Sequence, residues 1–162
     1  MTHSQATVRV ARPLAATFDY VGTHMRENHP SWEPEVLEIR PLTAGPMAVG
    51  SRAVMVRRDM GKVHETTYEV TRFEPGRRVA VRHMDGPMDF ALDLAFAAAG
   101  PDATDITSTV DIRLRGPMRL MTPVFWLTRD RTTRRIAQAM ARAVETHREA
   151  SAPGRAGVGA SS

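Results

Sequence analysis

The middle of the chain is a succession of short strand-like runs, and one long helix-like segment follows it. Between about residues 35 and 115, alternating apolar and polar residues are interrupted by clusters of glycine, proline and aspartate, which form turns. The links are short, so neighbouring runs are expected to pair antiparallel. From about 120 to 148 there is no glycine, and no proline after Pro123. The predicted strands are Glu35–Leu42, Gly50–Arg58, Lys62–Phe73, Arg77–Asp85, Met88–Ala98 and Thr104–Arg115.

The N-terminal part adds one further strand and two short helices. Thr7–Ala11 alternates between apolar and polar residues, which is typical of a half-buried strand. Pro13 suits the first position of a helix, and apolar residues at helical spacing extend that helix over 13–22. The stretch Met25–Pro34 contains two further prolines, so a helix there is limited to about one turn, with Trp32 as its anchor.

This order of elements predicts an α+β helix-grip fold, in which a seven-stranded antiparallel sheet curves around a long C-terminal helix. The two short helices follow strand 1. One face of the sheet is apolar and needs cover, and only the long helix is large enough to provide it. A single helix about 10 Å across does not fill such a concavity, so an apolar-lined cavity is expected, and such cavities usually hold ligands. On that helix, Phe125, Ile136, Met140 and Val144 form the apolar stripe, while Arg131, Arg135, Gln138 and Arg142 form the solvated face.

Length and composition limit the organisation further. A chain of 162 residues suits one domain, here 1–150, and the tail 151–162 is rich in Gly, Ala and Ser and is expected to be disordered. There is no cysteine, no signal peptide and no apolar run that reaches the length of a membrane span. We therefore expect a cytoplasmic protein without a membrane anchor, monomeric or homodimeric.

The net charge of +4 and the pI of about 10.5 raise the question of nucleic-acid binding. Only Lys62 among the 22 basic residues is a lysine, and the arginines are spread along the chain with acids between them. We therefore expect no nucleic-acid partner. His24 and His29 lie five residues apart without further ligands at regular spacing, so no metal is expected, and no cofactor either.

Several segments, taken in their order and spacing, resemble the SRPBCC superfamily, which includes START domains and the polyketide cyclase/dehydrase type. The resemblance covers about residues 6 to 148 and implies a pocket between sheet and helix that holds lipids, hormones, polyketides or similar molecules. Some members are aromatase/cyclases, whereas others carry ligands without reaction. In the cyclases an arginine in the pocket assists the reaction. In this sequence Val70 and Thr71 stand near the strand position that would match that arginine, so its role is not transferred. The segments are Val8–Pro13, Thr17–Val21, Trp32–Val36, Val49–Arg52 and Tyr68–Val79.

Two residues of one strand are the candidate catalytic groups. His64 and Tyr68 alternate with Thr66 and share a face with Val70. If that face lines the pocket, they can polarise a ligand carbonyl or relay a proton. The alternative is that His64 meets water at a sheet edge and Tyr68 only packs.

The candidate ligand-binding residues are aromatic, apolar or cationic side chains on the expected inner surface. His83 shares a face with Val79 and Val81, and Arg129 lies at the edge of the helix stripe, where its guanidinium can meet an anionic or keto group. Each candidate has an alternative interpretation. His83 is solvated, the Arg129 guanidinium extends to solvent while its stem packs, and the aromatic residues are part of the ordinary core. The full set is Trp32, His83, Phe90, Leu92, Phe125, Arg129 and Met140.

Three functions remain open from the sequence. The first is general acid–base cyclisation or dehydration of a polyketide-like chain held in the cavity. The second is non-catalytic carriage of a lipid-like small molecule. The third is a protein-interaction module, in which exposed arginines matter more than the cavity.

Overall fold

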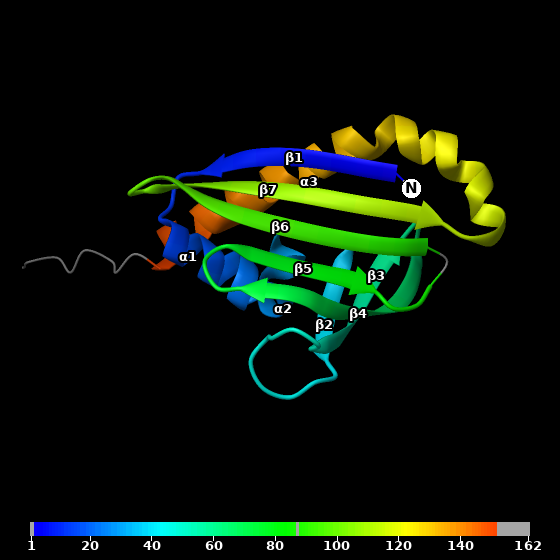
Figure 1. The fold of residues 1–162 in the computed structure, drawn as a ribbon, viewed down its shortest axis with the longest axis horizontal. Helices are drawn as coiled ribbons and strands as arrows, with labels where there is room; N and C mark the ends of the chain where they lie inside the picture. The colour runs from blue at the N-terminus through cyan, green and yellow to red at the C-terminus, as the bar shows by residue number, and fades with distance from the viewer. Residues whose placement is uncertain (1, 87, 152–162) are drawn as a thin grey trace, which may run out of the picture.

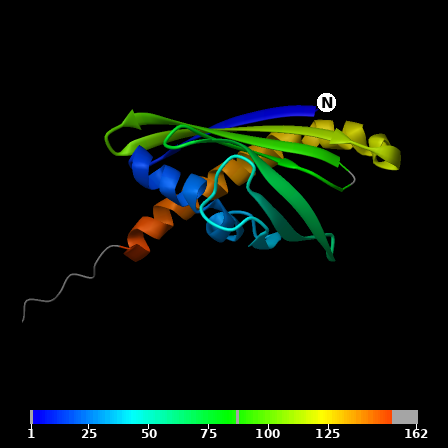
Figure 2. The same ribbon diagram turned by 60° about the horizontal axis from the view of Figure 1, so that its bottom comes forward.

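A computed structural model describes residues 2–86 and 88–151 of the chain. Seven strands form one antiparallel sheet in the order β1-β7-β6-β5-β4-β3-β2, and the long helix α3 crosses its concave side (Figures 1 and 2). The predicted helix-grip fold is therefore confirmed. The strands are β1 (Thr2–Val10), β2 (Val36–Pro41), β3 (Arg52–Asp59), β4 (Lys62–Glu74), β5 (Arg78–His83), β6 (Met88–Gly100) and β7 (Ala103–Leu114).

The helical segments fall into two groups, one after β1 and one after β7. The first group lies below the concave side of the sheet, and the second forms α3 and its short lead-in (Figure 2). The segments are α1 (Leu14–Phe18), the π-helical turn η1 (Asp19–Thr23), α2 (Met25–Asn28), the 3-10 turns η2 (His29–Ser31) and η3 (Gly116–Met121), and α3 (Thr122–Ser151). Residues 152–162, most of the tail expected to be disordered, lie outside the described residues.

The first strand is longer than the sequence indicates, because it begins at Thr2 rather than Thr7. Two of its inward-facing positions there, Thr2 and Ser4, are buried but polar. Ser4 donates a hydrogen bond to Thr133 Oγ1 at 2.9 Å and lies 3.0 Å from the Asp130 carboxylate, both on α3. Polar inward residues do not give an apolar alternation, so the period-two pattern missed this half of the strand.

The expected helix over 13–22 is interrupted, since α1 ends at Phe18 and a π-helical turn continues the chain. The wider turn brings Gly22 against the Phe18 ring. A Cβ atom at Gly22 would lie 3.0 Å from that ring, so only glycine lets the two residues approach this closely.

Helix α3 packs mainly along β1, at one edge of the sheet. Its predicted stripe is largely buried: Met140 and Val144 are in the core and Ile136 packs against it. The four residues predicted for the solvated face are all exposed. The helix period in the sequence thus placed the correct face inward.

The apolar core is concentrated at one end of the concave face, which we call the closed end. There the β6–β7 hairpin and the β4–β5 turn meet α1. Phe18 packs edge-on against Phe96, with ring centroids 5.1 Å apart, and Phe73 lies 5.8 Å away. The fully buried residues of this end are Val10, Val79, Leu94 and Ile106.

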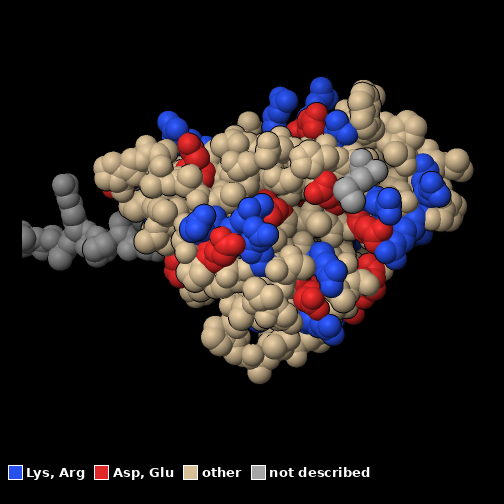
Figure 3. Space-filling model, in the orientation of Figure 1, with Lys and Arg blue, Asp and Glu red and all other residues tan. Residues whose placement is uncertain are grey.

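The convex face carries cross-strand ion pairs. Figure 3 shows basic and acidic side chains interspersed over this side of the sheet. Arg9 pairs with Asp105 at 2.8 Å, and Arg78 pairs with Asp93 at 2.7 Å. Arg52 lies 2.9 Å from Glu69. These arginines are therefore engaged by carboxylates of neighbouring strands, as the mixed charge pattern of the sequence indicates.

Candidate functional site

The concave face changes character toward the opposite end, which we call the open end. There β3, β5 and β7 finish and β4 and β6 begin. Leu94 on β6 is fully buried, whereas Leu92 and Phe90, next on the same face, are only partly buried. Val110 and Ile112, which pair with them on β7, are also partly buried. The open end therefore presents apolar inner surface that solvent still reaches.

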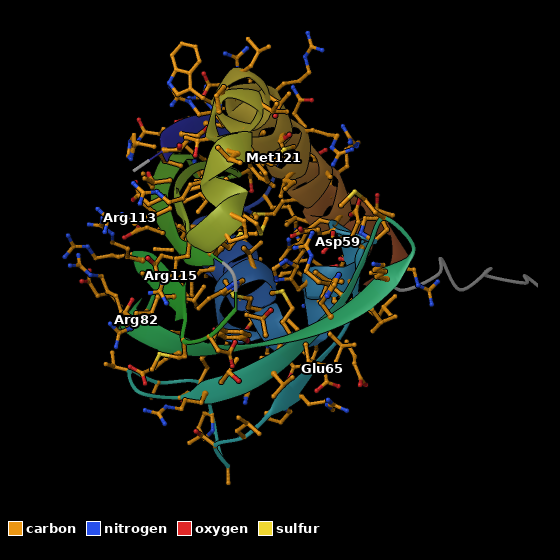
Figure 4. The ribbon with its side chains drawn as sticks, turned by 90° about the vertical axis from the view of Figure 1, so that its right-hand side faces the viewer. Asp59, Glu65, Arg82, Arg113, Arg115 and Met121 are labelled. Carbon is orange, nitrogen blue, oxygen red and sulfur yellow. The ribbon has the colours of Figure 1, made fainter. Side chains whose placement is uncertain are left out.

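A hollow of about 350 Å³ lies at this end, where β5 and β6 separate. His83 and Phe90 form one wall, with ring centroids 4.6 Å apart. The rest of the lining comes mostly from outward-facing positions of β5, β6 and β7, with Arg82, Arg113 and Arg115 among them, so the hollow opens largely on the convex side of the sheet; Figure 4 shows these arginines on the side of the sheet away from α3. A second hollow, of about 270 Å³, lies beside β2. Both are open to solvent, so the enclosed apolar cavity expected from the sequence stays a prediction.

Tyr68 and His83 stand directly opposite each other on β4 and β5. Side chains in such cross-strand positions have Cβ atoms about 5 Å apart, so the two act as neighbours on one face. The Tyr68 hydroxyl is buried and has no hydrogen-bond partner among the described residues. Burial raises the pKa of Tyr68 to about 12. The phenol is therefore protonated at neutral pH and has a free proton to donate.

His83 is held in its neutral form. Burial lowers the pKa of His83 to about 4, and the positive charge of Arg57 acts in the same direction. At pH 7 the imidazole therefore has one nitrogen that accepts a hydrogen bond or a proton. Together the two strands offer an O–H donor and an uncharged acceptor side by side.

Four hydrogen-bonded side chains, which we call the polar network, lie beside Tyr68 and His83. They are His29, Glu33, Arg57 and Asp59. His29 Nε2 is 2.8 Å from one Glu33 oxygen, and the other oxygen accepts a hydrogen bond from Arg57 at 3.1 Å. Arg57 also donates two hydrogen bonds to Asp59, at 2.7 and 2.9 Å. His29 stacks on Trp32, with ring centroids 5.2 Å apart, and its Nδ1 is buried without a partner. The polar network thus connects strand β3 with the helical segment that follows β1.

Glu33 and Arg57, the two charged residues in the middle of the polar network, stabilise each other. Burial alone would raise the pKa of Glu33, but the hydrogen bond from His29 and the charge of Arg57 outweigh it and lower that pKa. Burial likewise opposes the charge of Arg57, yet its bonds to Asp59 and its attraction to Glu33 raise its pKa. Arg57 is thus a fixed cation next to His83, which favours the neutral imidazole.

The structure separates the two residues expected to be catalytic. His64 is exposed and pairs with Arg57 near the start of β4. It lies four residues from Tyr68, which is about 13 Å along a strand. His64 and Tyr68 are therefore well separated, whereas Tyr68 and His83 are cross-strand neighbours; the catalytic role of His64 and Tyr68 stays a prediction.

The ligand-binding candidates divide between the hollow, the core and the long helix. Phe90 lies at the hollow with His83, and Leu92 lies next to it on the same face. Trp32 and Met140 are deep in the core, at 3% and 2% exposed. Phe125 is partly buried on α3. Arg129 lies over the Trp126 ring at 5.1 Å and 3.4 Å from Asp130, so its guanidinium is engaged near the helix surface.

The sequence analysis missed Arg57 and Glu33 as site residues. A signal for Arg57 is present, because it is in phase with Ala53 and Met55 on the inward face of β3, where a charged residue is unusual. Glu33 gave no such signal, since its partners come from distant parts of the chain. In the part of the chain that the structure describes, no group of three side chains is placed to hold a metal ion.

The family model described as "Polyketide cyclase / dehydrase and lipid transport" matches residues 1–148. No curated protein sequence matches the chain.

Several solved structures share the fold. An aromatase/cyclase from Streptomyces sp. R1128 superposes with a TM-score of 0.71 at 16% identity, over 96% of this chain and 98% of that one. A START superfamily protein from Mycobacterium smegmatis gives 0.69 at 17% identity, over 93% and 99%. Norcoclaurine synthase from Thalictrum flavum, in complex with dopamine and hydroxybenzaldehyde, gives 0.66 at 14% identity, over 94% and 88%. At these identities the similarity concerns the fold.

Proposed function

Because this chain belongs to the polyketide cyclase/dehydrase and lipid transport family, we propose that the open end of its concave face binds a hydrophobic small molecule that carries a carbonyl group. The observation that carries the proposal is the buried, unpartnered hydroxyl of Tyr68 beside the neutral His83. An unsatisfied buried donor costs about 1–3 kcal/mol, and a ligand carbonyl oxygen removes that cost.

The surroundings of this pair suit such a ligand. Phe90 and Leu92 supply partly exposed apolar surface on the same face, and Phe90 packs against the His83 ring. Apolar walls with a few placed polar groups are the usual composition of a small-molecule site. The norcoclaurine synthase structure, which shares this fold, contains an aromatic aldehyde. This supports a carbonyl compound as the ligand class.

A direct test measures binding of 2-acetylnaphthalene and of 2-ethylnaphthalene, which lacks the carbonyl. Tyr68→Phe removes only the hydroxyl. We expect it to weaken binding of the ketone about five- to tenfold, since one hydrogen bond contributes about 1 kcal/mol, and to leave the hydrocarbon unaffected. Leu92→Ala is expected to weaken both. Equal losses for both compounds in Tyr68→Phe would mean that the hydroxyl does not meet the carbonyl.

Native mass spectrometry of the purified protein gives a second, independent readout. A small molecule that stays bound under native conditions and leaves on denaturation has a defined mass, which reveals its class. We expect an apolar compound with at least one carbonyl. A retained molecule without one would contradict the ligand class, although not the binding.

A second candidate function is acid–base catalysis, favoured by the juxtaposition of Tyr68 and His83. His83 takes a proton from the carbon next to the ligand carbonyl, and the electron pair moves to the oxygen, which the Tyr68 O–H stabilises. The enolate carbon then forms a bond to a second carbonyl of the same molecule. The imidazolium returns its proton to the new alkoxide, and loss of that hydroxyl with a neighbouring hydrogen releases water.

Carriage and catalysis are distinguished by hydrogen exchange at the ketone. In D₂O, a catalyst of enolisation replaces the hydrogens next to the carbonyl with deuterium, which NMR detects. For a catalyst, exchange in 2-acetylnaphthalene is faster than in buffer and returns to the buffer rate in His83→Gln. A carrier binds the ketone without accelerating exchange. The low pKa of His83 makes it a weak base, which favours carriage until this exchange is measured.

A further inference from the structure

The large apolar residues that are exposed to solvent are gathered at the open end of the molecule. Three further exposed apolar residues lie around β2 instead: Leu37, Leu42 and Val49. Trp126 is 59% exposed and Leu120 is 85% exposed, values unusual for side chains of this size. We define the mouth patch as the exposed apolar side chains of η3, the start of α3, and the β3–β4 and β5–β6 turns. Its members are Met60, Val63, Met84, Leu120, Met121, Val124, Trp126 and Leu127.

The mouth patch lies at the same end of the sheet as the Tyr68–His83 pair. Figure 4 looks at this end: Met121 lies at the top, Arg113 and Arg115 lie to one side, and Glu65 lies below. Met84 of the patch lines the hollow beside His83 and Phe90, while most of the remaining lining belongs to the outer face of the sheet. The exposed apolar surface and the candidate site are therefore at the same end of the molecule.

Positive charge accompanies this apolar surface. Between residues 113 and 135 the chain has seven arginines and a single acidic residue, Asp130, whereas the whole chain has a net charge of only +4. The remainder of the chain is therefore slightly acidic. Arg115 is paired with Asp89, but Arg113 and Arg119 make no ion pair with any described residue.

Apolar side chains, an exposed tryptophan and free arginines are the combination that binds the surface of an anionic bilayer. A second copy of this chain is a poorer partner. A two-fold contact would place the same arginine-rich segment against itself, and like charges at close range oppose association. An anionic lipid surface has the complementary charge. No helix among the described residues is long and apolar enough to cross a membrane, so the contact is peripheral.

We propose that the mouth patch and its flanking arginines dock the protein on an anionic lipid surface, with the open end of the concave face toward the bilayer. An apolar ligand then passes between the bilayer and the concave face without crossing water. The docking stands independently of the ligand, whereas the transfer of a ligand rests on the function proposed above.

The first experiment measures co-sedimentation with vesicles of pure phosphatidylcholine and with vesicles containing 30% phosphatidylglycerol. We expect binding to the anionic vesicles at least about tenfold tighter, and weaker with added salt, because each arginine near an anionic surface contributes roughly fivefold. Tryptophan fluorescence reports the same event. Trp126 is exposed and its emission should shift to the blue, while Trp32 is already buried. Trp126→Phe should abolish the shift.

Matched variants identify the surface. The double variant Leu120→Asp/Leu127→Asp changes two exposed residues of the mouth patch and should reduce vesicle binding by more than tenfold. The control Leu42→Asp/Val49→Asp changes two exposed residues beside β2 and should bind like the unmodified protein. Arg113→Gln/Arg119→Gln should lose the preference for anionic vesicles. Arg77→Gln/Arg142→Gln, exposed and elsewhere, should keep it.

Three results would overturn the docking. They are equal binding to neutral and anionic vesicles, equal effects of the mouth-patch and control variants, or a lipid-free dimer that the Leu120→Asp/Leu127→Asp variant dissociates. The last would mean that a second copy covers the patch. The vesicle assays contain no ligand, and the same double variant should still bind 2-acetylnaphthalene in solution. Failure of docking and failure of ligand binding are thus observed separately.

Discussion

The two ends of the concave face are built from the same strands but differ in what their side chains do. On β6, Leu94 at the closed end is fully buried, while Leu92, two residues away on the same face, is not. The closed end is mostly apolar, and its buried polar residues are Thr17 and Thr104. The open end contains the hydrogen-bonded side chains of His29, Glu33, Arg57 and Asp59 and the Tyr68–His83 pair. Packing that stabilises the fold and groups able to bind a ligand are therefore separated along one sheet.

The largest expected effect comes from matched leucine truncations. Leu94→Ala leaves a cavity in a fully buried site and should lower the free energy of unfolding by about 3 kcal/mol. Leu92→Ala should cost less than half as much, because solvent already reaches that side chain. Urea denaturation measures both. Similar losses for the two variants would mean that the open end is packed as tightly as the closed end.

The polar network at the open end should also contribute to stability. Glu33→Gln leaves Arg57 without its partly buried counter-charge, so we expect a loss of about 2 kcal/mol, below the usual cost of a fully buried pair because Arg57 retains some exposure. Glu65→Gln, which removes an exposed partner of Arg40, should change stability by less than about 0.5 kcal/mol. Thermal or urea unfolding of the two variants compares them. A negligible effect of Glu33→Gln would mean that the polar network does not stabilise the fold.

The pH dependence of stability should report His83. Its pKa is about 4 in the folded protein against about 6.5 in an unfolded chain, so between these values the unfolded state binds the extra proton. Stability is therefore complete above about pH 6.5 and falls with decreasing pH, by at most about 1.4 kcal/mol per unit. His83→Gln should flatten this slope, and His64→Gln, at an exposed position, should not. A slope unchanged in His83→Gln would mean that His83 titrates normally.

The smallest expected effect has the opposite sign. Tyr68→Phe removes an unpartnered buried hydroxyl and should raise stability by up to about 1 kcal/mol while weakening ketone binding. Tyr20→Phe removes a hydroxyl that bonds to Ser31 at 3.0 Å and should lower stability by a similar amount. Differential unfolding of the two variants provides the test. A loss of stability in Tyr68→Phe would show that its hydroxyl has a partner in the folded protein.

The periodic parts of this fold could be predicted from the sequence, and the reason is local. Alternation within β6 and β7 and the 3.6-residue stripe of α3 depend only on which side of one element is buried. The first residues of β1 were not predicted as strand because the inward-facing Thr2 and Ser4 are polar, and Ser4 is hydrogen-bonded by α3, which is distant in the sequence. No local pattern encodes that contact.

The site was predictable only in part, for a similar reason. Period two placed Tyr68 and His83 on inward faces of their strands, but it does not tell which strand positions a helix covers. His64 therefore looked equivalent to Tyr68, although it lies exposed near the tip of the β3–β4 hairpin. The pairing of Glu33 with Arg57 joins two segments whose encounter depends on the whole sheet.

The sheet order has a consequence for how the chain folds during synthesis. Strand β1 pairs with β7, so that Val8 lies opposite Ile106, and α3 then covers β1 from the far end of the sequence. Strand β1 therefore lacks its pairing partner until β7 has also been synthesised. Long-range pairing of this kind slows folding and leaves an unpaired strand exposed in the meantime.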